Sequence, residues 1–356
     1  METRDLLRQR LANQHLAHPR LTQPAELVAW LGAVQAQDYP AAQWALAQRL
    51  VGATDISLEA AFNAGAILRT HVLRPTWHFV APADLRWLLA LTAPRVKARL
   101  APYDRRLGLD APVRQRAYAV FTQALQGGQP RTRPELDRAL HTAGLRLNGQ
   151  GLAHLVMHAE LDALICSGPR RGQQFTYMLL DERVPPAPAI SRPEALLALT
   201  ERYFTSHGPA QAPDFAWWSG LTLSDAKHGL ALAGARLARE TLGGKDFWFA
   251  PSPPARMPPM AYLLPNYDGY MLAYQDRSHF YDPAAFANPS ARDNVPFANM
   301  IVRHGRIIGL WKRTLTRHAV RVTTKFLQPP TAAEQRAVQA ALQRYGQFLG
   351  LAVVAS

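Results

Sequence analysis

The residues Ile67-Leu68-Arg69-Thr70-His71-Val72, Leu73-Arg74-Pro75 and Thr76-Trp77-His78-Phe79-Val80 decide how the fold is interpreted. The first and third runs are rich in β-branched and aromatic residues and flank a proline turn, so the pattern predicts a β-hairpin. Helices followed by a hairpin with a basic tip are typical of a winged helix. The apolar spacing around this hairpin predicts helices at about 3–16, 24–35, 41–50, 57–64 and 82–93.

The same order of elements recurs twice. In the second copy, one helix runs from Pro134 to about His141, and a turn around Asn148-Gly149 leads to a second helix that ends at Leu161. β-rich runs then lie on both sides of Gly168-Pro169-Arg170-Arg171-Gly172. A proline-rich linker at 184–188 leads to the third copy. That copy has helices near 193–206, 213–219 and 223–232, then β-rich runs at 235–242 and 247–250 around a Gly243-Gly244-Lys245-Asp246 turn.

A second proline-rich linker, Pro251–Pro259, introduces a region of different character. Short apolar runs predict a β-rich unit, which is closed by a helix from Ala332 to Leu349. These runs are 261–264, 271–274, 298–302, 307–311 and 319–324. We therefore predict an α+β, mostly helical fold with three tandem winged-helix units and a C-terminal β-rich unit. The predicted boundaries are 1–125, 126–183, 189–250 and 260–356.

The chain is strongly basic. Its 40 Lys and Arg against 26 Asp and Glu give a net charge of +14, and 48% hydrophobic residues can supply large cores. Seven Lys or Arg and no Asp or Glu lie between Arg303 and Lys325. Arginine enrichment can be purely compositional, and winged helices can also dock proteins. With this charge, however, a nucleic-acid partner is favoured. Three units in one chain form an asymmetric surface, unlike the dimers that bind palindromes.

Other features limit the class of protein. One cysteine, Cys166, excludes a disulfide framework and is typical of a reducing compartment. We expect a soluble, cytoplasmic monomer without a membrane span or cofactor. His154 and His158 have the spacing of a helical zinc pair, but the glutamate that normally follows the first histidine is missing, so we expect no metal.

Gln35-Ala36-Gln37 stands where a helix must stop, since Tyr39 precedes Pro40 and is disfavoured in helical conformation. We expect both glutamines at a helix end or in the following turn. In an extended or turning segment, residues two apart share a face, so the two amides could hold one water. Taken alone, such glutamines are more often helix caps or solvated surface residues.

Four motifs together resemble the AlkZ/YcaQ-like DNA glycosylases over nearly the whole chain. They are Val34-Gln35-Ala36-Gln37-Asp38 with Pro40, Leu68–Trp77-His78, His207-Gly208-Pro209 through Asp214–Gly220, and Leu263-Leu264-Pro265-Asn266-Tyr267-Asp268-Gly269-Tyr270 through Arg277. The resemblance implies tandem winged helices, excision of alkylated purines including bulky adducts or interstrand crosslinks, and catalysis by Gln35 and Gln37. Here the central residue of the catalytic motif is Ala36, which is smaller than in many members.

A purine alkylated at N7 or N3 is cationic and can leave as a neutral base without an enzyme acid. What remains is to stabilise an oxocarbenium-like sugar and to place a water against C1′, and neutral amides suffice for this task. Asp38 is a second choice as catalytic residue, because an acidic residue before Pro40 also suits the N-terminus of the next helix.

The sequence also suggests contacts to double-stranded DNA. We expect Arg69, His71, Arg74 and His78 to reach the damaged strand, and Trp77 to lie in the core. Arg170, Arg171, Lys245, Lys312 and Arg313 are candidate phosphate contacts at hairpin tips or on basic strands. The alternative is a non-catalytic winged-helix DNA-binding protein or transcription regulator, which would bind specific sequences and release no base.

Overall fold

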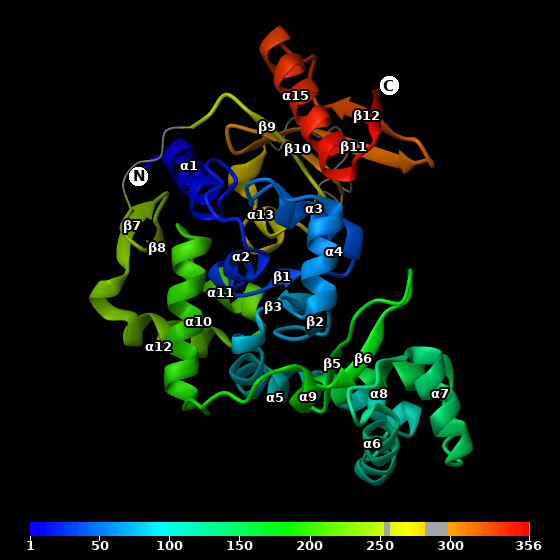
Figure 1. Cartoon of the computed structure of the whole chain (residues 1–356). Helices are drawn as coiled ribbons and strands as arrows, with labels where there is room; N and C mark the ends of the chain where they lie inside the picture. The colour runs from blue at the N-terminus through cyan, green and yellow to red at the C-terminus, as the bar shows by residue number, and fades with distance from the viewer. Residues whose placement is uncertain (253–256, 282–297, 356) are drawn as a thin grey trace.

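The computed structural model describes residues 1–252, 257–281 and 298–355. About half of the chain is helical, and the strands of the described residues form four separate sheets (Figure 1). The expected α+β class is confirmed. Part of the expected linker Pro251–Pro259, at 253–256, lies outside the described residues. Within the described ranges, no helix combines the length and the hydropathy that a membrane crossing requires.

The first group of elements contains the hairpin, which lies near the centre of the view in Figure 1. Strands β2 and β3 pair antiparallel, from Leu68 with Val80 to His71 with Trp77, which confirms the hairpin. The elements are α1 (Thr3–Asn13), α2 (Pro24–Leu31), β1 (Val34–Gln35), α3 (Tyr39–Ala47), α4 (Asp55–Ala64), β2 (Leu68–His71), β3 (Trp77–Val80), α5 (Pro82–Leu107) and α6 (Ala111–Leu125).

The helix expected at 24–35 is shorter than predicted. It ends at Leu31, because Gly32 adopts a positive φ of 77° that stops the helix. The chain then turns into β1, which pairs antiparallel with β3 through Gln35 and His78. Gln35 therefore lies in a strand and not at a helix end.

Helix α5 is longer than the expected 82–93. It continues through Pro94 and Pro102 to Leu107, although proline normally ends or kinks a helix. Val96 and Leu100 beyond the first proline are buried in the main hydrophobic cluster, so tertiary packing outweighs the local preference.

In the second and third groups, helices precede an antiparallel pair of strands, as expected, and in the second group one further short helix follows the strands. The second contains β4 (Arg131–Thr132), α7 (Arg133–Thr142), α8 (Gly149–Leu161), β5 (Ile165–Ser167), β6 (Thr176–Leu179) and α9 (Leu180–Arg183). The third contains α10 (Arg192–Ser206), α11 (Ala212–Ser219), α12 (Leu223–Ala233), the short helix η1 (Gly234–Arg236), β7 (Ala238–Leu242) and β8 (Lys245–Phe249). Capping boxes start α7, α10 and α12.

The C-terminal region forms a five-stranded sheet in the order β13-β12-β11-β10-β9, covered by α15 (Figure 1). The run expected as a strand at 271–274 belongs instead to helix α13 and its end, because Asp268 caps the helix by accepting from the Tyr270 backbone N–H at 2.8 Å. The elements are β9 (Ala261–Leu264), α13 (Gly269–Leu272), η2 (Ser278–Phe280), β10 (Met300–Arg303), β11 (Arg306–Leu315), β12 (Ala319–Phe326), α15 (Ala332–Leu349) and β13 (Ala352–Ala355).

One hydrophobic cluster contains buried side chains from all four predicted ranges, including Leu7, Leu180, Leu199 and Met271. The unit boundaries therefore stay a prediction. Cys166 lies in the same cluster, fully buried, as expected of a core residue.

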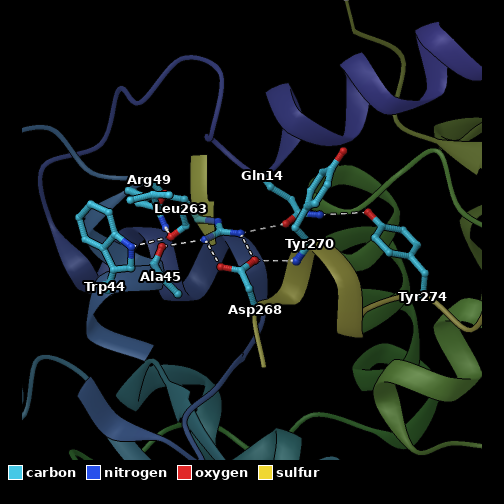
Figure 2. Close-up of polar contacts among 9 residues, drawn as sticks. Gln14, Trp44, Ala45, Arg49, Leu263, Asp268, Tyr270 and Tyr274 are labelled. Atoms are coloured by element: carbon cyan, nitrogen blue, oxygen red, sulfur yellow. Dashed lines mark hydrogen bonds and ion pairs between the residues drawn. The ribbon is translucent and has the colours of Figure 1, made fainter. Parts of the chain in front are cut away.

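A buried polar network also joins the N-terminal helices to the C-terminal region (Figure 2). The Arg49 guanidinium donates to both carboxylate oxygens of Asp268, at 2.6 and 3.0 Å, and to Gln14 Oε1 at 3.2 Å. Gln14 in turn donates to the Tyr274 hydroxyl at 3.0 Å. Since both charges are almost completely buried and mutually hydrogen-bonded, the network holds α13 against the first group of helices.

Candidate active site

The Gln35-Ala36-Gln37 segment is held on both sides of its backbone. The Ala36 N–H donates to the Trp77 carbonyl oxygen at 2.7 Å, and the Ala36 carbonyl oxygen accepts from Arg69 Nε at 2.9 Å. Ala36 is fully buried, whereas Gln35 is half-buried and Gln37 is exposed. The buried and doubly hydrogen-bonded Ala36 therefore fixes the backbone positions from which the Gln35 and Gln37 side chains extend.

Both glutamine side chains have a defined partner. Arg74 Nη2 donates to Gln35 Oε1 at 2.8 Å, and the Trp77 N–H makes a longer bond of 3.4 Å to Gln37 Oε1. In each case the amide carbonyl is the acceptor, which leaves the amide N–H groups unused by these contacts. Each carbonyl oxygen also keeps a second lone pair for a water.

Arg69 supports this segment from the middle of a layered stack. Its guanidinium carbon lies 4.3 Å from the ring centroid of Trp77 and 4.5 Å from that of Phe175. Arg170 continues the stack, 4.9 Å from the rings of both Phe175 and Tyr39. Burial lowers the pKa of Arg69 to about 10, so it stays charged at neutral pH. The second hairpin thus packs against the catalytic candidates.

His71 and Glu160 form a buried pair behind the same stack. His71 Nδ1 bonds to a Glu160 carboxylate oxygen, and the His71 ring lies 4.4 Å from that of Trp77. Glu160 comes from α8, so this pair connects the first hairpin to the second group of elements. Trp77, expected in the core, is half-buried and lies between these supporting side chains and Gln37.

A small cavity of about 20 Å³ adjoins Gln35. Its wall includes Arg49, Arg74, His78 and His207. This volume has room for one water. Burial lowers the pKa of His78 and of His207 to about 3, so both imidazoles are neutral at pH 7.

A larger cleft of about 750 Å³ begins at Asp38. Asp38 is engaged there: it accepts from the Ala41 N–H at 3.1 Å as the cap of α3, and from Asn266 Nδ2 at 3.2 Å. The cleft lining also includes the cations Lys312, Arg313 and Lys325 from β11 and β12. The expected helix-capping role of Asp38 is thus observed beside a basic cleft.

The expected DNA contacts fall into three kinds of position. Arg69, His71 and His78 are buried and bound to protein partners, and Arg74 is half-buried on Gln35. Arg170 is half-buried in the stack, while Arg171 and Lys245 are exposed but paired with Glu135 and Asp276. Lys312 and Arg313 line the cleft. Direct contact with DNA stays a prediction for all of them.

Sequence reasoning missed the residues that come from distant segments. Phe175, Glu160 and Asn266 each touch the site, yet none has a spacing relative to Gln35 that would have revealed it. The histidine pair of α8 is explained by Asp104 of α5, whose two carboxylate oxygens bond His154 at 3.2 Å and His158 at 2.8 Å. In the described part of the chain, no cluster of metal-ligating residues large enough for an ion is present.

Residues 28–348 match the model of the AlkZ-like DNA glycosylases, which are DNA repair enzymes, and the chain belongs to that family, as its motifs predicted. The fold matches the solved structure of Streptomyces sahachiroi DNA glycosylase AlkZ with a TM-score of 0.79 and 20% sequence identity, over 100% of both chains. No curated protein sequence matches the chain.

Proposed function

We propose that this glycosylase hydrolyses the N-glycosidic bond of cationic N7- or N3-alkylated purines in double-stranded DNA, including bulky adducts or interstrand crosslinks, with a water positioned by Gln35 and Gln37. The enzyme is monofunctional, requires no cofactor and acts as a monomer in the cytoplasm or on the nucleoid. The proposal is supported most by one observation. The backbone of Ala36 is clamped between Trp77 and Arg69, so that both amides have fixed starting points beside a basic cleft.

The proposed chemistry breaks the bond between C1′ and the purine and forms a bond from C1′ to the water oxygen. The bonding electrons leave with the base and neutralise its positive charge, and the proton of the water passes to solvent. Gln35 Oε1 accepts from Arg74 and can accept one O–H of the water with its second lone pair. Such positioning suits a substrate that is already activated. Uncharged bases should therefore be poor substrates.

The proposed DNA surface follows the three groups of helices and hairpins, taken as tandem winged-helix units at 1–125, 126–183 and 189–250, together with the C-terminal unit at 260–356. Lys312, Arg313 and Lys325 face the cleft at Asp38 and support binding of the phosphate backbone next to Gln37. Arg69, His71 and His78 support the site from within, because they are buried on protein partners.

The test is base release from a duplex that carries one 7-methylguanine, read as alkali-dependent strand cleavage under single-turnover conditions. We expect Gln35→Ala and Gln37→Ala each to slow release by about 100-fold, since positioned general catalysis contributes on the order of 10²- to 10⁴-fold. DNA affinity should change little, because neither glutamine is a phosphate contact in this scheme.

Asp38→Asn is the matched control. It keeps a side-chain oxygen for the Ala41 cap, removes the negative charge and replaces the oxygen that accepts from Asn266 with an amide NH2 group. We expect release within about threefold of the parent rate, well below the 10²-fold contribution of a positioned catalytic group. If base release were much slower in Asp38→Asn but normal in both glutamine variants, Asp38 and not the glutamines would be the catalytic residue. Sequence-specific binding without any base release would support the regulator instead.

A further inference from the structure

Trp217, near the C-terminal end of α11, is a large apolar side chain that is exposed yet fixed. It is 44% exposed. Its indole N–H donates to the Leu272 carbonyl oxygen at 3.1 Å, and the Arg277 guanidinium carbon lies 5.4 Å from the centre of its ring. Because the exposed indole is already anchored at its edge and flanked by a cation, little conformational freedom remains for binding to remove.

This indole lies beside the candidate active site. Leu272, which accepts its hydrogen bond, and the neighbouring Trp218 both line the small cavity at Gln35. Gly220, at the end of the same helix, packs so tightly on the first hairpin that an added Cβ would lie 2.2 Å from the Leu73 carbonyl oxygen. The end of α11 therefore meets the hairpin turn next to Arg74.

The charges connect the same elements. Burial and, to a smaller extent, the nearby positive charge of Arg277 together lower the pKa of Arg74 to about 10. Arg277 thus contacts Trp217 and is close enough to repel the positive charge of Arg74, which holds Gln35. Trp217 and Arg277 therefore place an aromatic ring and a cation near the glutamine site.

We propose that Trp217, backed by Arg277, is a stacking subsite for a planar aromatic ring system that enters with the damaged strand. Stacking on an anchored indole does not depend on the DNA sequence or on the hydrogen-bonding groups of the stacked ring, and an adjacent guanidinium strengthens it. The ring could be a nucleobase displaced from the helix or an aromatic group attached to the purine. This inference rests on the proposed function, since it names a substrate contact of the same site.

The test compares three duplexes with a single adduct: N7-methylguanine, N7-benzylguanine and N7-(cyclohexylmethyl)guanine. Benzyl and cyclohexylmethyl groups have similar size, but only the first is aromatic. For each duplex, both the dissociation constant and the single-turnover rate of base release are measured. The variants are Trp217→Ala and Trp217→Leu, with Trp217→Phe as the conservative replacement that keeps a ring.

Trp30 provides the matched control. It is also exposed, at 38%, and its indole N–H also donates to a backbone carbonyl, that of Asn13 at 2.7 Å. Its ring neighbour is His15, whereas the ring neighbour of Trp217 is the cation Arg277. Trp30→Ala should leave binding and release unchanged for all three duplexes.

For Trp217→Ala and Trp217→Leu, we expect a loss of about 5- to 100-fold in affinity or rate, as for removal of one base–aromatic stack, and recovery in Trp217→Phe. A loss confined to the benzyl duplex identifies the adduct ring as the ligand. An equal loss on all three identifies a nucleobase. Parent-like affinities and rates in both variants on every duplex would overturn the subsite.

Failure of the proposed function looks different. If the parent released no base from any duplex, or if Gln35→Ala and Gln37→Ala released it at the parent rate, the catalytic proposal would fail. The dissociation constants of the Trp217 variants do not depend on base release, so they would still decide whether the indole stacks on a ring.

Discussion

The hairpins β2–β3 and β11–β12 are both basic, but their cations have opposite surroundings. In β2–β3, Arg69 lies between two aromatic rings and His71 bonds to a buried glutamate. In β11–β12, Lys312, Arg321 and Lys325 are exposed, and two of them line the cleft at Asp38. The difference shows that the neighbours of a cation, and not its position on a hairpin, decide whether it supports the protein or can meet a ligand.

We call β2–β3 the inner hairpin and β11–β12 the outer hairpin. The largest expected effect concerns the buried pair of His71, on the inner hairpin, and Glu160. Glu160→Ala leaves His71 without its partner in a site that is almost completely buried. We expect a loss of about 3–5 kcal/mol in the free energy of unfolding, as for other broken buried pairs. Chemical denaturation measures it. Arg171→Ala, which breaks the exposed pair with Glu135, should have a far smaller effect. Equal losses would erase the distinction between buried and exposed charge pairs.

The next largest effect is expected for Arg69→Met. The methionine keeps much of the apolar contact with Trp77 and Phe175 but removes the bond to the Ala36 carbonyl oxygen. We expect about 100-fold slower release of 7-methylguanine, which corresponds to about 2.7 kcal/mol in the barrier, with the DNA dissociation constant unchanged. Arg69→Lys should recover part of the rate. If Arg69→Met weakened DNA binding while the rate at saturating protein stayed normal, Arg69 would be a DNA contact after all.

Acid should destabilise the protein in part through His78 of the inner hairpin. Burial lowers the pKa of His78 to about 3 from an ordinary value of 6.5, so below pH 6.5 the unfolded chain binds more protons than the folded one. Stability present at pH 7 is therefore lost as the pH falls, by about 2 kcal/mol at pH 5 for this histidine.

The measurement is the change in unfolding free energy between pH 7 and pH 5, compared between the parent and His78→Gln. The variant should lose about 2 kcal/mol less than the parent over this interval. His318→Gln, in the exposed turn of the outer hairpin, should behave like the parent. A parent-like pH dependence in His78→Gln would mean that His78 does not supply this acid sensitivity.

The smallest effect belongs to the outer hairpin. Lys312→Ala should weaken binding to all duplexes by a similar factor and reduce the slope of log K against log salt by about 0.9, since one phosphate contact is lost. Release at saturating protein should stay at the parent rate. Equilibrium binding at several salt concentrations measures the slope, with Lys227→Ala on α12 as a surface control. An unchanged slope in Lys312→Ala would remove this lysine from the DNA surface.

Local signals in the sequence predicted much of the fold. The hairpin around Pro75 and most of the longer helices follow from apolar periodicity and turn residues, but α6 was not predicted. The early end of α2 has a local signal, Gly32, that the prediction overlooked. Two features depended on tertiary contacts instead, namely the addition of β1 to the hairpin and the continuation of α5 past Pro94.

The residues of the candidate site also divide into those that a local sequence signal indicates and those that only the tertiary structure brings together. Gln35 and Gln37 could be named from their motif, and Asp38 from its place before a helix. The surroundings of Arg69 could not, because Phe175 and Glu160 lie about a hundred residues further along the chain and have no periodic relation to it. Basic residues on a strand look alike in a sequence, whether aromatic rings or solvent surround them.

The burial of Cys166 has a chemical consequence for an enzyme proposed to work where alkylating agents are present. Such electrophiles react with thiolates far faster than with thiols. Cys166 is the only cysteine of the chain, it is fully buried in β5, and burial raises its pKa to about 12. The protein therefore presents no reactive sulfhydryl to the compounds that would create its substrates, and should survive exposures that inactivate thiol-dependent enzymes.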